Sequence, residues 1–295
     1  MRTVFAGTSS FASSVLERLA ATDHRPVLVV TRPDRPRGRG RRVAPPPVAV
    51  VARQLGIEVA QPADVNDEAA RRRIAAASPE VVCVCAFGAL IREPLLSDHL
   101  MLNVHPSLLP RWRGAAPVER AIMAGDDRIG VSIMRVTAGL DSGPVCLQEP
   151  EPISPDDTYG SLAPRLERLG ARLLILALSE RPPFREQDEA GATYADKIGT
   201  ADRLLDPSRP ASELERVVRA LHPHIGARAA LPDGEMLTVH AAAVRDEGPP
   251  PGRLAAEGGR LLLGCANGAL ELRIVQPAGG RPMEAAAYLR GHAAV

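Results

Sequence analysis

Residues 79–88, PEVVCVCAFG, decide the fold of this chain. The run from Glu80 to Phe87 is almost wholly apolar and lies between a proline and a glycine, two residues that interrupt regular structure. A short apolar run bounded in this way is typical of a strand buried on both faces, as in the centre of a parallel sheet. The stretch therefore predicts a central parallel strand in an α/β fold.

Short apolar runs alternate with helical patterns on either side of this strand. Further strands are predicted at Thr3–Ala6, Pro26–Thr31, Met101–Val104 and Gly130–Val136. Apolar residues at helical spacing predict helices at Ser9–Ala21, Val48–Leu55, Asp67–Ala77, Ala116–Ala124 and Asp157–Leu178. Strands that alternate with helices form a parallel sheet covered by helices, because parallel neighbours need a crossover connection. We therefore predict a Rossmann-like parallel-sheet domain over residues 1–180.

The pattern changes after residue 180. Residues 181–205 contain Pro182, Pro183 and many charges without a sustained period, which predicts a linker. Beyond it, a helix is predicted at Ala211–Leu221 and short strands at Met236–Val239, Arg260–Leu263 and Leu270–Val275. Short strands separated by glycine and proline clusters are typical of a small barrel or sandwich. The pattern therefore predicts a small β-barrel or sandwich domain over residues 206–295.

Composition narrows the class of protein. A chain of 295 residues with 45% hydrophobic residues can bury sizeable cores, and a net charge of +1 favours neither a nucleic-acid coat nor a membrane surface. No stretch approaches 18 apolar residues, and the first residues do not resemble a signal peptide. The four cysteines form no Cys-x-x-Cys pair, so we expect core thiols and no metal. We expect a soluble, cytoplasmic protein with no membrane partner.

Polar side chains follow two predicted strands, at the edge where open parallel sheets bind ligands. Asn103 and His105 lie two residues apart on a strand, so both project to the same side. Asp141 lies in the glycine-flanked loop after the next strand. An amide for an oxyanion, an imidazole acid–base and an orienting carboxylate are the groups that acyl transfer to an amine requires. From spacing alone, Asn103 can equally cap a turn, His105 can be a loop histidine, and Asp141 can bond its own turn.

The motifs around these residues resemble the folate-dependent formyltransferase family. They read FGALI at residues 87–91, NVHPSLLPRWRGAAP at residues 103–117 and LDSG at residues 140–143. The resemblance implies Asn103, His105 and Asp141 as the catalytic residues and 10-formyltetrahydrofolate as the formyl donor. A flat pterin needs an apolar slot with polar backbone groups at its edge. The resemblance implies a folate pocket lined by Phe87, Gly88, Leu90, Ser107, Leu108, Leu109 and Pro110.

An arginine-rich segment indicates the formyl acceptor. Residues 32–42 read RPDRPRGRGRR and hold six arginines and one acid, a local charge of 6 − 1 = +5. Prolines and glycines forbid a regular helix there and predict a projecting loop, at the same edge of the sheet as the candidate site. The tRNA-acting members of the family carry a similar insertion. The resemblance implies phosphate contacts with tRNA from Arg35, Arg37, Arg39, Arg41 and Arg42. A solvated basic loop without a partner is the alternative.

The rest of the chain bears on the same acceptor. The tRNA-acting members also continue into a C-terminal barrel, and the resemblance implies a small OB-like β-barrel over residues 206–295. YADKI at residues 194–198 resembles their linker. We therefore expect a monomer that transfers formyl to the amino group of methionine on initiator tRNA. Two features depart from the pattern: residues 206–295 hold ten arginines against ten acids, and LHPHIG at residues 221–226 replaces a more aromatic motif. We expect His222 and His224 in a loop or facing RNA rather than in a metal site.

Three other readings of the sequence predict different behaviour. A formyltransferase that acts on an aminosugar nucleotide would keep Asn103, His105 and Asp141 but would not need the arginine segment. A nucleotide-dependent oxidoreductase is disfavoured, because AGTSSF at residues 6–11 lacks the Gly-x-Gly-x-x-Gly turn. An RNA-binding module without catalysis would not need the three residues.

Overall fold

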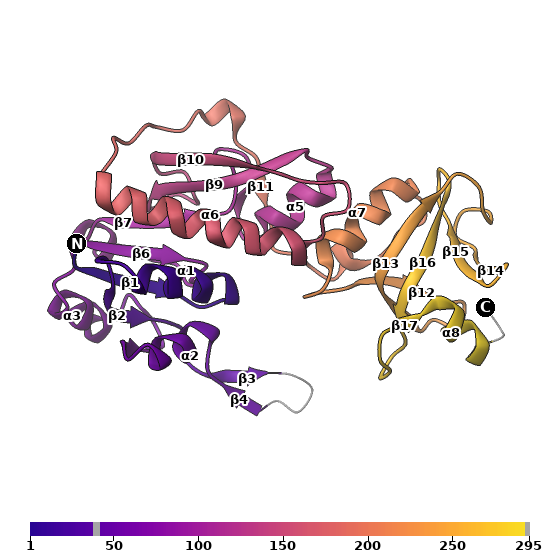
Figure 1. Cartoon of the computed structure of the whole chain (residues 1–295), viewed down its shortest axis with the longest axis horizontal. Coiled ribbons are helices and arrows are strands. Elements are labelled where there is room, and N and C mark those ends of the chain that lie inside the picture. Colours follow the sequence, from indigo (N-terminus) through magenta and orange to yellow (C-terminus); the bar gives the residue numbers. More distant parts are fainter. Residues whose placement is uncertain (38–41, 293–295) are drawn as a thin grey trace. The chain divides into compact units, whose positions relative to one another are not determined.

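The computed structural model describes residues 1–37 and 42–292, which form two compact units (Figure 1). The first unit comprises residues 1–114, 129–151 and 163–194. The second comprises residues 115–128, 152–162 and 195 onward. The helix predicted at Ala116–Ala124 therefore belongs to the same unit as the C-terminal residues.

A mixed sheet forms the frame of the first unit. Its order, over the described residues, is β10-β9-β7-β6-β1-β2-β5. The strands are β1 (Thr3–Gly7), β2 (Pro26–Val30), β5 (Glu58–Ala60), β6 (Val81–Cys85), β7 (Met101–His105), β9 (Arg128–Arg135) and β10 (Val145–Pro152). The strands from β5 to β7 run parallel, and β6 lies in the middle with every residue buried, as predicted. The parallel order ends at β7, because β9 pairs with it antiparallel.

Among the described residues, four helices of the first unit lie between these strands along the chain, and a fifth follows the last of them. They are α1 (Ser10–Ala20), α2 (Pro47–Gln54), α3 (Glu68–Ala76), α4 (Leu95–Asp98) and α6 (Tyr159–Glu180). Helix α1 begins where the Ser9 hydroxyl accepts a hydrogen bond from the Ala12 N–H at 3.2 Å, and the Asp67 carboxylate caps α3 in the same way. Helices α1, α2, α3 and α6 match predicted helices to within about two residues at each end, whereas α4 was not predicted.

The arginine-rich segment, predicted as a projecting loop without helix, contains a short two-stranded ribbon between β2 and α2. Strands β3 (Arg35–Arg37) and β4 (Arg42–Ala44) pair antiparallel, with Arg37 opposite Arg42. Proline is compatible with a two-stranded ribbon because each strand has an unpaired edge. Arg39 and Arg41 lie outside the described residues.

The second unit is built on an antiparallel sheet. Strands β12 (Ala227–Ala230), β13 (Met236–Arg245), β16 (Ala269–Gln276), β15 (Arg260–Gly264) and β14 (Leu254–Glu257) pair in this order, and β17 (Met283–Glu284) pairs with β16. The unit also contains α5 (Pro117–Ala124), η2 (Ala201–Arg203), α7 (Ala211–Leu221) and α8 (Ala285–Gly291). Helix α7 matches its prediction, whereas β12, β14, β17 and α8 were not predicted.

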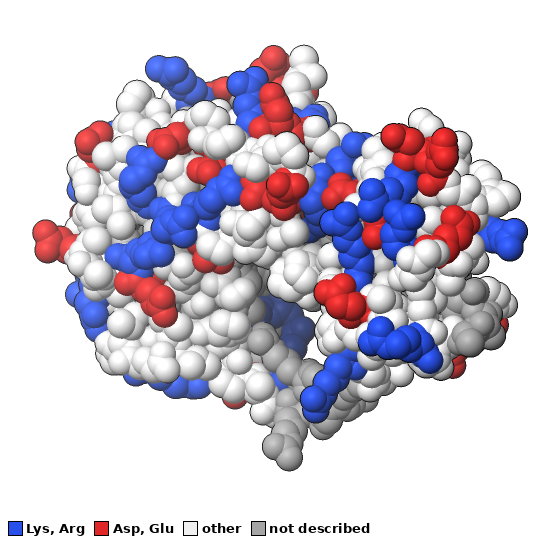
Figure 2. All heavy atoms as spheres, turned by 45° about the vertical axis from the view of Figure 1, so that its right-hand side comes forward, with Lys and Arg blue, Asp and Glu red and all other residues white. Residues whose placement is uncertain are grey.

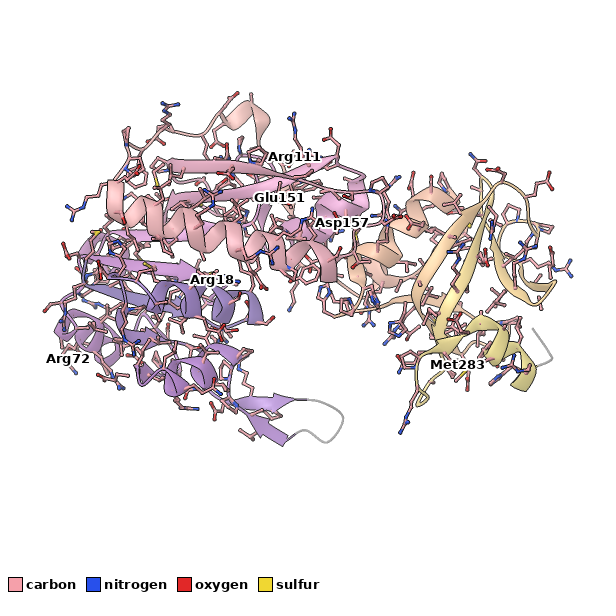
Figure 3. The ribbon with its side chains drawn as sticks, in the orientation of Figure 1. Arg18, Arg72, Arg111, Glu151, Asp157 and Met283 are labelled. Atoms are coloured by element: carbon pink, nitrogen blue, oxygen red, sulfur yellow. The ribbon has the colours of Figure 1, made fainter. Side chains whose placement is uncertain are left out.

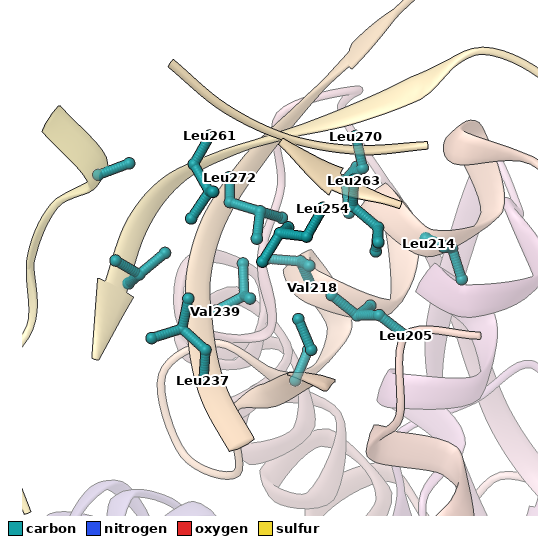
Figure 4. Close-up of a cluster of buried hydrophobic side chains, with 14 of the residues drawn as sticks. Leu205, Leu214, Val218, Leu237, Val239, Leu254, Leu261, Leu263, Leu270 and Leu272 are labelled. Atoms are coloured by element: carbon teal, nitrogen blue, oxygen red, sulfur yellow. The ribbon is translucent and has the colours of Figure 1, made fainter. Parts of the chain in front are cut away.

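Each unit has its own hydrophobic core. In the first unit, apolar side chains of β1, β2 and β6 pack with those near β7, among them Val4, Leu28 and Val82. In the second unit, leucines and valines of α7 pack onto the inner face of the antiparallel sheet (Figure 4), where Leu214, Leu237 and Leu272 are fully buried. No helix of residues 1–37 and 42–292 is long and apolar enough to span a lipid bilayer.

Candidate functional site

His105 ends strand β7, and its two ring nitrogens face different partners. Nε2 lies 2.8 Å from the carbonyl oxygen of Trp112. A carbonyl can only accept, so Nε2 must carry the proton in this contact. Nδ1 is then left to take or release a proton, and it faces Asp141, with 3.7 Å between Nδ1 and Oδ2. The side chain is only 5% exposed, so its orientation is fixed by packing as well.

Asp141 lies in the loop between β9 and β10. Its Oδ2, the oxygen nearest to His105, also accepts a hydrogen bond from the Gly114 N–H at 2.9 Å. Its φ of +44° places it in the left-handed region, where aspartate is tolerated better than most residues. Gly143 closes the loop against β9, since a Cβ on it would lie 1.9 Å from the Arg135 carbonyl oxygen. The loop therefore holds the carboxylate against the segment that also orients His105.

Asn103 lies on the same strand as His105, in register with Val84 on β6 and Met134 on β9. It is the one partly buried residue of β7, whose other residues are buried. Within residues 1–37 and 42–292, its side-chain amide has no hydrogen-bond partner, so its N–H groups are available to a substrate oxygen. Asn103 and His105 both lie on β7, two residues apart, as the sequence predicted, and alternation along a strand directs both side chains to one face.

The Ser107–Pro110 loop follows β7 and is held by side chains of β9 and β10. The Ser132 hydroxyl donates to the Ser107 carbonyl at 2.6 Å and accepts from the Leu109 N–H at 3.1 Å. The Gln148 amide donates to the Leu109 carbonyl at 2.8 Å. Gly130 on β9 leaves room for Leu108, because a Cβ there would lie 2.5 Å from the leucine side chain. The loop backbone beside the carboxyl end of β7 is thus constrained by these contacts.

The residues predicted to line a folate pocket differ in exposure. Ser107 is fully buried and donates its hydroxyl to the Arg111 carbonyl, while Phe87 and Leu109 belong to the core. Leu108 and Pro110 are partly buried, Gly88 is exposed, and Leu90 is 63% exposed. Leu108, Pro110 and Leu90 therefore retain apolar surface that a pterin can contact. Their role in folate binding stays a prediction.

Only part of the predicted tRNA contacts can be placed. Arg35 is exposed on β3, and the backbones of Arg37 and Arg42 pair in the ribbon. Arg32 is turned toward the site instead, where its guanidinium donates to the carbonyl of Gly88. This contact ties the base of the arginine segment to residues 87–91.

Several site residues were not predicted from the sequence. Ser132, Gln148 and Gln187 act through partners between 16 and 74 residues away, so no local motif marks them. Arg113 did stand inside a quoted motif, and its burial to 2% exposure was the unexpected feature.

The histidine motif of the second unit forms no metal site in the described residues. The ring of His224 stacks on Tyr159 with centroids 3.7 Å apart, and its Nε2 lies 2.9 Å from the Glu119 carboxylate. The ring of His222 packs edge-on against His240. The rings are thus held by aromatic and carboxylate partners rather than gathered around one point.

A cavity of about 430 Å³ lies away from these residues. It is lined by Val81, Leu100, Leu102, Leu178 and Phe184, at the amino ends of β6 and β7. Because ligands of parallel sheets bind at the carboxyl ends, it does not belong to the Asn103–His105–Asp141 site.

The chain is similar to formyltransferases over nearly its whole length. The family model described as "Formyl transferase" matches residues 1–178, and "Formyl transferase, C-terminal domain" matches residues 197–293. The methionyl-tRNA formyltransferase of Stenotrophomonas maltophilia (strain R551-3) is 45% identical over 98% of this chain and 97% of its own length. That of Ectopseudomonas mendocina (strain ymp) is 44% identical over 96% and 92%. The chain belongs to the methionyl-tRNA formyltransferase family.

A solved structure shares the fold at low sequence identity. The N-formyltransferase from Helicobacter canadensis, in complex with folinic acid and dTDP-3-aminofucose, superimposes with a TM-score of 0.67 at 14% identity. The match covers 92% of this chain and 98% of that one. The predicted combination of a Rossmann-like domain with a second β domain is therefore confirmed.

Proposed function

We propose that this chain transfers the formyl group of 10-formyltetrahydrofolate to the amino group of methionine on initiator tRNA, and that Asn103, His105 and Asp141 carry the reaction. The observation that carries the proposal is the pairing of His105 Nδ1 with Asp141 Oδ2 at 3.7 Å, while Nε2 is held by the Trp112 carbonyl. Substrate binding commonly tightens such contacts to hydrogen-bond length.

The chemistry follows from the three side chains. The methionyl amine attacks the formyl carbon, and a new C–N bond forms as the carbonyl oxygen becomes anionic. The Asn103 amide donates to that oxygen, since its N–H groups have no other partner in the described residues. The amine proton passes through water to Asp141 and His105. The C–N bond to the folate then breaks, and the folate nitrogen takes up the proton.

The acceptor would be held through charge and through the second unit. We assign Arg35, Arg37, Arg39, Arg41 and Arg42 to the tRNA phosphates, because guanidinium groups bind phosphate at fixed geometry and stay charged. We retain residues 1–180 as the catalytic domain, residues 181–205 as a linker and residues 206–295 as a tRNA-binding domain. A monomer in the cytoplasm completes the proposal.

The aminosugar-nucleotide alternative has less support. The relatives that match at 44–45% identity are named for methionyl-tRNA, whereas the sugar enzyme is 14% identical and shares the fold alone. No described feature of the site favours a sugar nucleotide.

A formylation assay tests the proposal. Purified full-length protein is mixed with methionyl-initiator tRNA or with dTDP-3-aminofucose, each with and without 10-formyltetrahydrofolate. We expect formylmethionyl-tRNA only when the folate is present, and rates that fall steeply as salt rises. Folded protein that leaves the tRNA unformylated at low salt would contradict the function. Formylation of the sugar alone would establish the alternative.

A further inference from the structure

The segment predicted as a linker contributes a side chain to the candidate site. Gln187 lies on this segment, in the first unit, between α6 and η1 (Glu189–Gly191). Its Nε2 donates to the carbonyl of Asp141 at 2.8 Å and to that of Gly143 at 2.7 Å. These two carbonyls belong to the loop that presents the Asp141 carboxylate. One amide group therefore fixes the loop backbone at two points, two residues apart.

The other end of the same amide is also engaged. Gln187 Oε1 accepts from the Arg113 guanidinium, at 3.1 Å from Nε and 2.9 Å from Nη2. Carbonyls can only accept and a guanidinium can only donate, so the amide has one possible orientation. Arg113 is 2% exposed and also forms a two-point contact with Glu189, at 2.9 and 2.7 Å. Gln187 thus holds the Asp141 loop from a buried anchor.

The anchor, Arg113, belongs to the short segment that also contacts His105 and Asp141. Arg113 lies between Trp112, whose carbonyl accepts from His105, and Gly114, whose N–H donates to Asp141 Oδ2. Arg113 therefore affects the 3.7 Å separation of His105 and Asp141 in two ways. Its backbone neighbours contact both side chains, and its guanidinium holds Gln187, which in turn holds the Asp141 loop. A loop that carries a residue with φ of +44° needs such constraints to persist.

We propose that Gln187 is a positioning residue for formyl transfer: its amide couples the Asp141 loop to residues 112–114 and so sets the distance between carboxylate and imidazole. The inference rests on the proposed roles of His105 and Asp141. It predicts that Gln187 acts on turnover rather than on substrate affinity. A shift of about 1 Å in a reacting group can cost about 100-fold in rate.

Two substitutions separate the two ends of the amide. Gln187→Leu removes all four hydrogen bonds, and Gln187→Glu retains acceptors for Arg113 but cannot donate to the loop carbonyls. We expect both to lower kcat by about 10- to 100-fold, with KM for tRNA and for folate within about twofold. Glu186→Gln, at the exposed neighbouring position, is the control and should match the wild type. Melting temperatures of all variants are recorded alongside. A Gln187→Glu variant with full kcat would overturn the inference.

A double-mutant cycle with Asp141→Asn tests whether Gln187 acts through Asp141. If it does, Gln187→Leu should lower kcat by less than about threefold once the carboxylate is absent. Equal losses in both backgrounds would mean a general structural role and would refute the inference. Should Gln187→Leu turn over normally while Asp141→Asn is inactive, the inference fails and the catalytic assignment stands. If Asp141→Asn is fully active, the catalytic assignment fails, and the positioning role fails with it.

Discussion

Ala86, Trp112 and Asp141 adopt left-handed backbone conformations, with φ of 41°, 62° and 44°. Such values cost residues with a Cβ on the order of 1–3 kcal/mol, and they persist where the surroundings hold them. Ala86 follows β6 at the carboxyl edge of the sheet. Trp112 is hydrogen-bonded to His105, and Asp141 is hydrogen-bonded to Gly114. Three of the five non-glycine residues with positive φ in the described chain thus lie beside the candidate site, and Ser78 and Arg181 lie elsewhere.

Asn103 should affect turnover without affecting the fold. Replacing it with alanine removes a donor to the developing oxyanion, which typically lowers kcat by about 10²- to 10³-fold. Because the amide has no partner within the described residues, its loss leaves no buried group unpaired. We expect the melting temperature to stay within about 2 °C of the wild type. Steady-state kinetics and calorimetry on the same preparation check both expectations, and a kcat within twofold of the wild type would exclude the oxyanion role.

Asp141→Asn separates charge from shape at one position. Asparagine also tolerates a positive φ, and its oxygen can still accept from the Gly114 N–H, so the loop should be retained. Only the negative charge beside His105 is lost, and we expect kcat to fall by about 10²- to 10⁴-fold. Asp141→Ala should in addition lower the melting temperature, because alanine is strained there. Identical melting temperatures for the two variants would argue against a constrained loop.

The stability of the second unit should decrease in mild acid because of His222. Burial, with smaller contributions from His240 and His224, lowers the pKa of His222 below its ordinary 6.5. Its Nδ1 is buried and has no hydrogen-bond partner among the described residues. Below pH 6.5 the unfolded chain binds a proton that the folded chain resists, so this contribution is complete above pH 6.5 and declines as pH falls toward the folded-state pKa. The melting temperature of His222→Gln should therefore fall less than that of the wild type when the pH is lowered from 7.5 to 5. Parallel curves would contradict this.

The site was predictable only in part. The spacing of Asn103 and His105 on one strand, with the Gly139–Gly143 loop after the next, was sufficient to nominate three residues when combined with the family motifs. The partners that fix their geometry were not, because Gln187 is 46 residues from Asp141 in sequence and Trp112 contributes only a carbonyl. Such contacts depend on the folded backbone and leave no pattern of residue types.

At the scale of elements, burial decided which strands and helices could be predicted. Strand β6 is wholly apolar because both of its faces are covered, whereas β10 alternates partly buried and exposed residues and contains two prolines. The short β5 at the sheet edge and the two arginine strands were missed for the same reason, since edge strands are short and carry polar residues. The antiparallel course of β9 was hidden because a buried strand has the same composition in either direction.

The β3–β4 ribbon should govern tRNA affinity. Arg35→Glu changes the charge by two in an exposed position, and Arg72→Glu makes the same change on α3, where the side chain is 70% exposed (Figure 3). We expect Arg35→Glu to raise KM for tRNA about three- to tenfold and to reduce the log–log salt slope by about 0.9. Arg39→Glu should behave likewise, and Arg72→Glu should leave both quantities unchanged. An equal effect at both sites would mean that net charge, rather than the ribbon, attracts the tRNA.

At the scale of the whole molecule, the protein is nearly neutral. The net charge is +1, and Figure 2 shows basic and acidic side chains interspersed over the face in view. The +5 of residues 32–42 is therefore a local feature within a nearly neutral protein. Attraction of a polyanion by a small basic patch falls off within about 10 Å at moderate salt, which makes binding specific to the part of the RNA that reaches it.

Because each unit has its own hydrophobic core, we expect a core substitution in one unit to destabilise mainly that unit. Leu272 is fully buried in the second unit, and Leu28 is 2% exposed in the first. Truncating either to alanine removes contacts and leaves a cavity, which costs about 2–5 kcal/mol. We expect Leu272→Ala to lower a thermal transition while the affinity for folate, measured by titration at 25 °C, stays unchanged. Leu28→Ala should weaken folate binding on mild heating, because its core supports the sheet that ends at the site. If Leu272→Ala lost folate affinity in step with its melting temperature, the two cores would have to unfold together, and the division of labour between a catalytic and a tRNA-binding part would need another physical basis.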